Sequence, residues 1–247
     1  MIDYILKHKL YLGASYEFLA MLSAVWYYFH FKDSISRGLK LFILYLVIVF
    51  IVDTSGFYAL WAYLDNYETI PALKDSPFAR NFWLYNALHV IGYFCIGYFF
   101  TSQLEYLQKY KLKKILNILL VGIVIYSLVC YLTFGTFFET YDPSVMIIGT
   151  LAVVLCIMAY FFELLLSEKI LHFRTNLLFY FAVVIMMWHL VITPINLYMS
   201  YTGLSNIEFR QFYITFLHWM NFIMYNTFAV GFFLAYLRRR KQALSLG

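Results

Sequence analysis

Apolar residues follow one another in seven long runs, and the charged residues gather in the short segments between them. Each run reaches about 20 residues, the length that an α-helix needs to cross the hydrocarbon core of a bilayer. The pattern predicts an all-α polytopic membrane protein, with residues 1–247 forming a single seven-helix transmembrane bundle. The predicted helices lie near 10–31, 41–64, 78–104, 115–134, 144–167, 175–200 and 211–237.

Two of the predicted helix starts carry a local signal. Ser76 precedes Pro77, and Asp142 precedes Pro143. A short polar side chain caps the free amides of a helix start, and proline suits the first helical position because its missing N–H has no partner there. We therefore expect Ser76 to cap the third helix and Asp142 to cap the fifth.

The composition agrees with a membrane as the main solvent. Hydrophobic residues make up 64% of the chain, aromatic residues 22% and charged residues only 13%, and the mean hydropathy is +0.74. A soluble domain of this length needs charged residues on every amphipathic element. The composition therefore excludes an ordinary soluble protein.

The basic residues predict the orientation of the bundle. Of the 18 lysine and arginine residues, 13 lie in segments 32–40, 109–114, 169–174 and 238–241, which alternate with segments holding the other five. Cytoplasmic segments retain basic residues, so we expect the N-terminus outside and the C-terminus in the cytoplasm. The cluster at 238–241 is expected to anchor the tail to anionic lipid, and we expect no nucleic-acid partner.

Five ionisable residues fall inside the predicted helices at a similar depth. Each lies about 7 to 12 residues from the outer helix end, or roughly 10 to 18 Å at 1.5 Å per residue. Each costs about 2.5 to 3.5 kcal/mol on insertion, so each is expected to have a partner or a function. These residues are Glu17, Asp53, His89, His189 and His218.

Other polar residues follow these five at helical spacing, on the same helix faces. A polar stripe facing lipid would leave its hydrogen-bonding groups unsatisfied, so we expect the stripes to converge on a polar cavity that opens outward. Together with the five ionisable residues, the predicted ligand-binding set includes Asn86, Thr193, Asn196, Asn221 and Tyr225.

Three interpretations of this polar layer remain open at the level of sequence. The groups can satisfy one another as interhelical hydrogen bonds. They can line a ligand pocket. They can also bind a metal, since His89, His189 and His218 with Asp53 would make a four-ligand zinc site, or two histidines on separate helices could bind haem. No HxxxH or HExxH pair in the sequence selects a metal.

Glu163 lies near the inner end of the fifth predicted helix. We expect its side chain to reach the membrane interface or to pair with Lys109 or Lys169.

The residues argue against two well-known seven-helix families. A retinal Schiff base needs a lysine in the last helix, and 211–237 contains none, so we expect no retinal pigment. G-protein-coupled receptors carry DRY after the third helix and NPxxY in the seventh, whereas this chain has Gln103-Leu104-Glu105-Tyr106 and no NPxxY.

The stretches Asn81-Phe82-Trp83-Leu84-Tyr85-Asn86, Tyr160-Phe161-Phe162-Glu163-Leu164-Leu165 and Ser167-Glu168-Lys169-Ile170 resemble a group of uncharacterised seven-helix integral membrane proteins of Bacteroidota. The resemblance spans roughly the third to the seventh helix. It implies a location in a bacterial inner (cytoplasmic) membrane and no particular activity.

The sequence favours a receptor-like small-molecule sensor or accessory membrane subunit with an outward-facing polar pocket, rather than an enzyme. Because no soluble domain is evident, we expect the output to pass through a protein partner or a second copy of the chain. The alternative is a membrane-embedded metal-dependent hydrolase or transferase acting on lipid. The third hypothesis is a haem-binding electron carrier.

Overall fold

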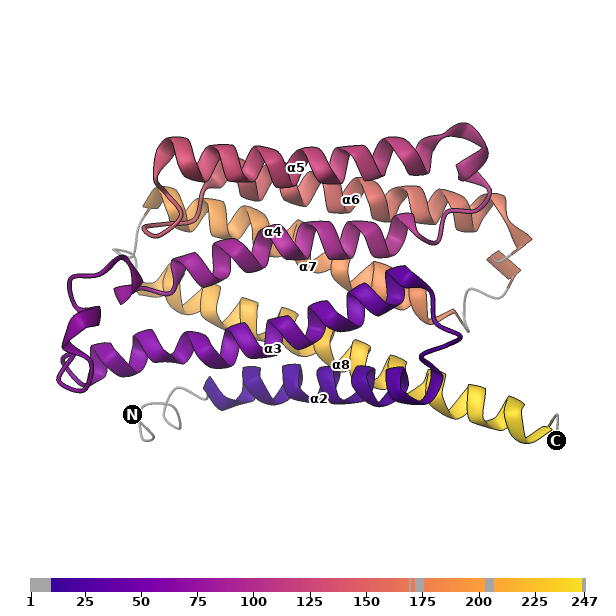
Figure 1. Ribbon diagram of the computed structural model, residues 1–247, viewed down its shortest axis with the longest axis horizontal. Coiled ribbons are helices and arrows are strands. Elements are labelled where there is room, and N and C mark those ends of the chain that lie inside the picture. Colours follow the sequence, from indigo (N-terminus) through magenta and orange to yellow (C-terminus); the bar gives the residue numbers. More distant parts are fainter. Residues whose placement is uncertain (1–9, 169, 172–175, 203–206, 246–247) are drawn as a thin grey trace.

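The computed structural model describes residues 10–168, 170–171, 176–202 and 207–245. Within these ranges the chain forms seven α-helices and no strand, which confirms the all-α prediction (Figure 1). The helices are α2 (Leu10–Phe31), α3 (Arg37–Leu64), α4 (Phe82–Thr101), α5 (Leu112–Phe134), α6 (Pro143–Leu166), α7 (Leu177–Thr202) and α8 (Ile207–Ser245). Three short 3-10 helices lie in the connections: η1 (Pro71–Leu73), η2 (Pro77–Ala79) and η3 (Leu107–Tyr110).

Five of these helices are long and apolar enough to cross a membrane, as expected of an integral membrane protein. Among the described residues the candidate spans are Arg37–Leu64, Leu112–Phe134, Pro143–Leu166, Leu177–Tyr198 and Gln211–Gln242. The other two helices, α2 and α4, have similar lengths, but polar side chains interrupt their apolar sequence.

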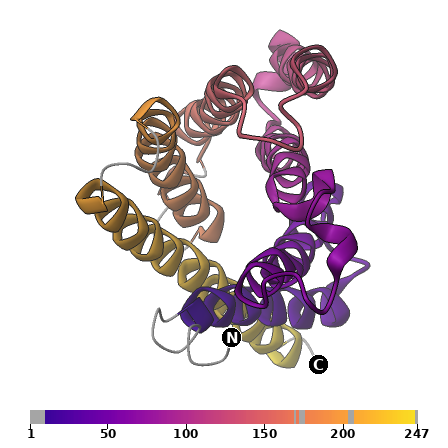
Figure 2. The ribbon, with the colours of Figure 1, turned by 90° about the vertical axis from the view of Figure 1, so that its left-hand side faces the viewer.

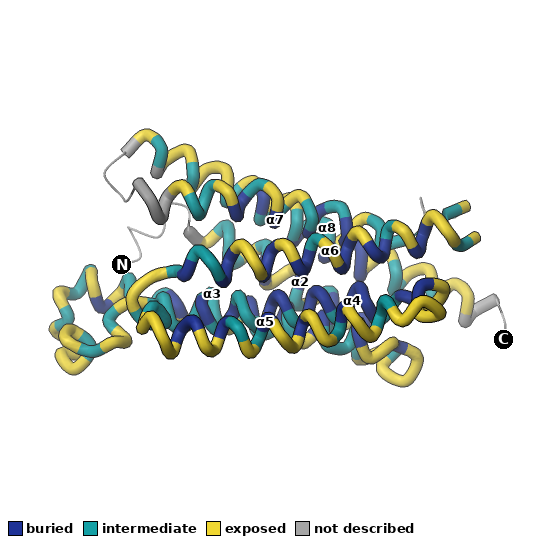
Figure 3. The backbone as a smooth tube through the Cα atoms, turned by 90° about the horizontal axis from the view of Figure 1, so that it is seen from above, coloured by how far each residue is buried: buried dark blue, intermediate teal, exposed yellow. Residues whose placement is uncertain are grey.

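The outward faces of the helices are strongly apolar. Large hydrophobic side chains such as Leu132 (85% exposed), Phe29 (70%) and Leu165 (64%) project away from the bundle. Figure 3 shows exposed positions along the outer sides of the helices and buried positions between them. Such a continuous apolar surface suits hydrocarbon and would be unfavourable in water.

Six helices form a closed ring, and α5 lies outside it. Going around, α2, α3, α4, α6, α7 and α8 each pack against the next, and α8 packs against α2. The remaining α-helix, α5, packs mainly on α4 and α6, at the periphery (Figure 2). Neighbouring ring members alternate in direction along the bundle except at two places: α4 and α6, which α5 separates in the sequence, run parallel, and so do α8 and α2 (Figure 1).

The described basic residues gather at one end of the bundle. Segments 32–40, 109–114 and 238–241 lie at this end, whereas the connection between α3 and α4, which includes Lys74 and Arg80, lies at the opposite end (Figure 1). Arg239 donates to Ser34 Oγ at 2.7 Å, and its guanidinium lies 5.3 Å from the ring centroid of Phe31, so the tail of α8 is attached to α2. The prediction also used residues outside the described set, namely Lys7, Lys9, Lys169, Arg174 and the side chain of Arg210.

The predicted start of the third helix is wrong by one turn. Ser76 does cap a helix with proline at its first position, but that helix is the short η2. Arg80 then adopts an extended conformation (φ −112°, ψ 156°), which breaks the helical path before α4 begins at Phe82. By contrast, Asp142 caps α6 as predicted, since its Oδ1 accepts from the amides of Ser144 (2.9 Å) and Val145 (3.3 Å).

The last helix is longer than predicted. We expected it to end near 237, where the apolar run stops, but α8 continues to Ser245. Charged residues such as Arg238 and Lys241 have high helix propensity, so a helix does not have to end where its lipid-facing sequence ends. The apolar pattern therefore located the span but not the helix end.

The connection between α3 and α4 folds back on the end of the bundle. Asp65 caps the end of α3, and its Oδ2 accepts from the amide (2.8 Å) and hydroxyl (2.5 Å) of Thr69. These hydrogen bonds hold the pKa of Asp65 below its ordinary value. The hydroxyl of Tyr58 donates to the carbonyls of Phe78 (2.6 Å) and Arg80 (3.1 Å), which attaches the connection to α3.

Glu163 differs from the prediction made for it. Its side chain is 1% exposed and makes no contact with the interface. One carboxylate oxygen accepts from the amides of Glu105 (3.0 Å) and Tyr106 (2.7 Å), and the other accepts from the amide of Leu107 (2.9 Å). Glu163 therefore fixes the connection that follows α4 by binding three backbone amides, instead of pairing with Lys109; Lys169 lies outside the described residues.

A cluster of phenylalanines closes the centre of the ring. Phe42 of α3 stacks on Phe99 of α4 with ring centroids 4.6 Å apart, and it meets Phe228 of α8 edge-on at 5.3 Å. Phe181 of α7 lies 5.0 Å from Phe228 and 5.4 Å from Phe232. All five rings are buried. We call Phe42, Phe99, Phe181, Phe228 and Phe232 the phenylalanine cluster.

Candidate functional site

A cavity of about 520 Å³ lies inside the ring of six helices. Every ring helix contributes to its wall, and α5 contributes nothing. The lining runs from Phe42 and Phe228, which belong to the phenylalanine cluster, to Asn196 and to Tyr141, in the connection before α6. The cavity therefore extends from the phenylalanine cluster toward the end of the bundle opposite the basic segments, and its volume is that of a typical small-molecule pocket.

Eight of the ten predicted site residues line this cavity. They come from α2, α3, α4, α7 and α8, so the ring brings together residues up to two hundred positions apart in the sequence. The eight residues are Glu17, Asp53, His89, His189, Thr193, Asn196, Asn221 and Tyr225.

Asn86 does not line the cavity and has a structural role instead. Its side chain is buried and donates to the carbonyls of Phe137 and Thr140, each at 2.9 Å. The hydroxyl of Tyr131 donates to its carbonyl oxygen at 3.4 Å. Asn86 thus attaches the connection between α5 and α6 to α4, and it is not among the residues of the cavity wall.

His218 is the second predicted residue that lies away from the cavity. Its Nε2 is 3.4 Å from the hydroxyl of Tyr16, and the two rings have centroids 5.6 Å apart. Both residues lie where α8 packs on α2. The polar side chain is therefore satisfied by a neighbouring helix, outside the cavity wall.

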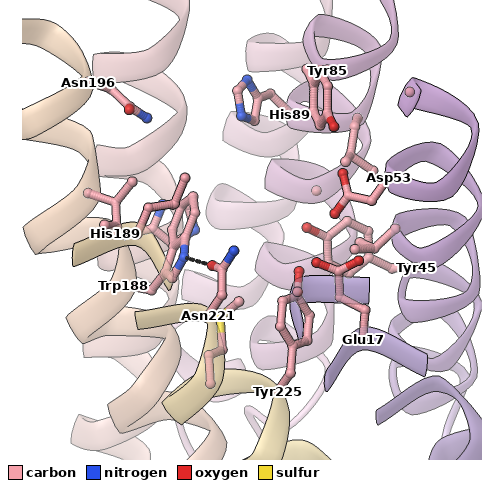
Figure 4. A pocket seen from close by; sticks show the side chains of 18 of the residues that line it. Glu17, Tyr45, Asp53, Tyr85, His89, Trp188, His189, Asn196, Asn221 and Tyr225 are labelled. Carbon is pink, nitrogen blue, oxygen red and sulfur yellow. Dashed lines mark hydrogen bonds between the residues drawn. The ribbon is translucent and has the colours of Figure 1, made fainter. Parts of the chain in front are cut away.

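The two carboxyl groups meet on one side of the cavity. Figure 4 shows Glu17 and Asp53 pointing toward each other, with the hydroxyls of Tyr45, Tyr85 and Tyr225 directed at the same space. Glu17 is only 5% exposed, and its Oε2 has no hydrogen-bond partner in the described structure. Burying a carboxyl oxygen without a partner costs free energy, so this side of the cavity has one unsatisfied hydrogen-bond acceptor.

Neutral hydrogen-bonding groups occupy the opposite side. The hydroxyl of Thr150 lies 2.8 Å from that of Thr193 and 3.3 Å from Nδ1 of His189. The indole N–H of Trp188 donates to the side-chain oxygen of Asn221 at 2.7 Å, which joins α7 to α8 (Figure 4). These groups already have partners, in contrast to Oε2 of Glu17.

His89 lies beside Tyr85 on the part of the wall that α4 forms (Figure 4). Its ring is close to those of Tyr93 (6.1 Å between centroids) and Tyr141 (5.6 Å), and its Nδ1 has no hydrogen-bond partner. Tyr93 can occupy the wall only because α6 carries Gly149 there, where a Cβ atom would clash with the tyrosine ring. Burial raises the pKa of Tyr141, so this hydroxyl remains a neutral donor.

The described lining contains two carboxyl groups and no strongly basic side chain. Among the wall residues that the structure describes, Glu17 and Asp53 are accompanied by no lysine or arginine. A pocket for phosphate or carboxylate would require basic groups. The wall is otherwise rich in aromatic rings, including those of Tyr45, Trp188 and Tyr213.

The predicted zinc ligands are not assembled. Asp53, His89 and His189 reach the cavity, but His218 lies on the α2–α8 interface. In the part of the chain that the structure describes, no three His, Cys, Asp or Glu side chains are grouped so that they could hold a metal ion.

Sequence reasoning left Tyr45, Trp188 and Tyr213 out of the site. A helical spacing could have identified Tyr45, because Tyr45, Val49 and Asp53 recur every four residues on one face of α3. The same spacing could have identified Trp188, because Trp188, Ile192 and Asn196 recur every four residues on α7. It could also have identified Tyr213, because Tyr213, Leu217 and Asn221 recur every four residues on α8.

Compared with known protein families, curated proteins and solved structures, the chain shows no match.

Proposed function

We propose that this protein is a receptor-like small-molecule sensor or accessory membrane subunit, which binds its ligand in the cavity inside the six-helix ring. The observation that carries the proposal is the cavity itself: about 520 Å³ of space whose wall includes eight polar residues from five helices. Helix packing alone favours close contact of apolar and small residues. A large polar space at the centre of a bundle is instead typical of a binding site.

The proposed topology has seven spans, with the N-terminus outside and the C-terminus in the cytoplasm of a bacterium, in its inner membrane. It is supported by the apolar helices, by the 13 of 18 basic residues on alternate connections, and by the resemblance noted above. In this orientation the cavity opens to the outside, and ligand occupancy reaches a partner chain through the helices of the ring.

Reporter fusions test the orientation. A fluorescent protein fused after Gly247 is expected to fold and fluoresce in the cytoplasm, whereas alkaline phosphatase at this position should be inactive. As a control, alkaline phosphatase fused after Glu139, in the connection between α5 and α6, is expected to be active. The opposite pattern at both positions would contradict the orientation and would place the cavity on the cytoplasmic side.

A cavity-filling substitution tests the function. Ala14 lines the cavity, so Ala14→Phe places a ring in the space that a ligand would use. Gly122 lies on the peripheral α5 and has open space beside it, so Gly122→Phe adds the same bulk away from the cavity. Compounds are screened for an increase in the melting temperature of purified protein, since a ligand of the native state stabilises it.

We expect at least one compound to stabilise the native chain and Gly122→Phe but not Ala14→Phe. Compounds that stabilise all three proteins equally would show that binding occurs outside the cavity. A collection in which no compound stabilises the native chain would favour a purely structural polar layer.

A further inference from the structure

We propose that the ligand is an organic cation, with a protonated amine or quaternary ammonium group held between Glu17 and Asp53 and an apolar body enclosed by aromatic rings. The inference rests on the proposed binding function of the cavity and names the chemical class of the ligand. It follows from three features of the wall, which concern charge, aromatic content and the arrangement of its two sides.

The first feature is the unbalanced acidic pair. Glu17 and Asp53 lie together on the wall, and the wall residues that the structure describes include no lysine or arginine. Glu17 is a residue of the cavity wall, and its Oε2 is buried without a hydrogen-bond partner, so one acceptor at this wall is unsatisfied. A cationic N–H group would give this oxygen a charge-assisted hydrogen bond. Its positive charge would also offset the electrostatic repulsion between the two carboxylates.

The second feature is the aromatic surface around the acids. The rings of Tyr45, Tyr85 and Tyr225 carry hydroxyls directed at the same space, and those of Phe42 and Phe228 form its inner end. Aromatic faces attract ammonium groups, most strongly where water is excluded. An aromatic and acidic wall therefore suits an alkylated or aryl-substituted cation better than a strongly hydrated one.

Size distinguishes an organic cation from a bare metal ion. A divalent ion requires several oxygen ligands at about 2.0 to 2.6 Å, and the described residues contain no suitable group of three His, Cys, Asp or Glu side chains. The volume of about 520 Å³ instead leaves room for an extended molecule. The opposite side, with His189, Thr193 and Asn221, offers neutral groups for a polar substituent at its far end.

Three probes of nearly equal shape test the charge requirement. They are 2-phenylethylamine, which is cationic at neutral pH, 2-phenylethanol, which is neutral, and phenylacetate, which is anionic; benzyltrimethylammonium adds a quaternary cation. Binding to the purified full-length protein in detergent is measured by calorimetry and by the shift in melting temperature. We expect either cation to bind at least about tenfold more tightly than the alcohol, as one charge-assisted hydrogen bond allows.

The charge preference is expected to depend on the acidic pair. Glu17→Gln and Asp53→Asn keep the shape of each side chain and remove its charge, so each should reduce the preference for the amine over the alcohol by about tenfold. Glu139→Gln removes an exposed carboxylate from the same end of the bundle, outside the cavity wall, and should leave the preference unchanged. The comparison of the probes on the unsubstituted protein does not depend on whether any variant folds.

Several outcomes would overturn the assignment. They are tighter binding of the alcohol or of phenylacetate, failure of both cations to bind, and a preference that survives both Glu17→Gln and Asp53→Asn. If neutral or anionic probes bind and Ala14→Phe abolishes this binding, the cation assignment fails while the proposed binding function stands. If Ala14→Phe leaves binding of every probe unchanged, the binding function of the cavity fails as well.

Discussion

Replacing Glu163 by leucine is expected to lower the free energy of unfolding by about 3 to 5 kcal/mol, the range for removing one partner from a buried charged interaction. The carboxylate accepts from the amides of Glu105, Tyr106 and Leu107, and all three bonds are lost together. Leucine fills much of the space but accepts no hydrogen bond, so the three amides would lose the acceptor that the carboxylate provides. The connection after α4 would then lose its attachment to α6.

Glu163→Gln separates the charge from the hydrogen bonds. The amide side chain keeps one acceptor oxygen and turns an N–H₂ group toward an N–H of the backbone, so we expect a smaller loss, about 1.5 to 3 kcal/mol. Glu168→Gln, which alters an exposed carboxylate five residues away, should change stability little. Unfolding in mixed detergent micelles measures all three variants. Equal stabilities of Glu163→Leu and Glu168→Gln would show that the three amides do not depend on this carboxylate.

The helices were predictable because each long apolar run must form its backbone hydrogen bonds internally in a membrane. The described helix positions follow the runs closely, for example Leu112–Phe134 where 115–134 was expected. Errors arise where apolarity does not decide the helix end. The start of α4 depends on the backbone conformation of Arg80, and the end of α8 on a polar segment that remains helical.

The arrangement of the ring was not predictable from hydropathy, because all the runs are apolar enough to pack in either an inner or a peripheral position. The predicted polar layer separated the helices only in part. The fourth and fifth predicted helices, 115–134 and 144–167, contributed none of its residues, and only the fourth is the peripheral α5. The fifth corresponds to α6, which belongs to the ring, so polar residues within spans do not by themselves show which helices surround the centre.

The candidate site was predictable in its general location and less so in its membership. A polar group in an apolar helix needs a partner, but the sequence does not say which kind. Asn86 has its partners in the carbonyls of Phe137 and Thr140, and His218 has its partner in Tyr16. Those partners lie far away in the sequence, so only the packing of the helices separates these two residues from the eight in the wall.

Replacing Phe42 by alanine is expected to destabilise the bundle by about 3 to 5 kcal/mol, the usual cost of deleting a buried phenylalanine ring. Phe42 is 0% exposed and contacts Phe99, Phe181 and Phe228, so its loss removes packing among four helices at once. Because Phe42 also lines the cavity, the vacated volume joins the cavity instead of being filled by relaxation.

The matched control is Phe29→Ala, which removes the same ring from an apolar outer position that is 70% exposed. There the lost contacts are mainly with detergent or lipid, so the free energy of unfolding should change by roughly 0.5 kcal/mol or less. Phe42→Leu keeps part of the volume and should fall between the two alanine variants. If Phe42→Ala and Phe29→Ala are equally stable in the same detergent, the phenylalanine cluster does not hold the ring together, and the inner end of the cavity is not the packed floor that these contacts indicate.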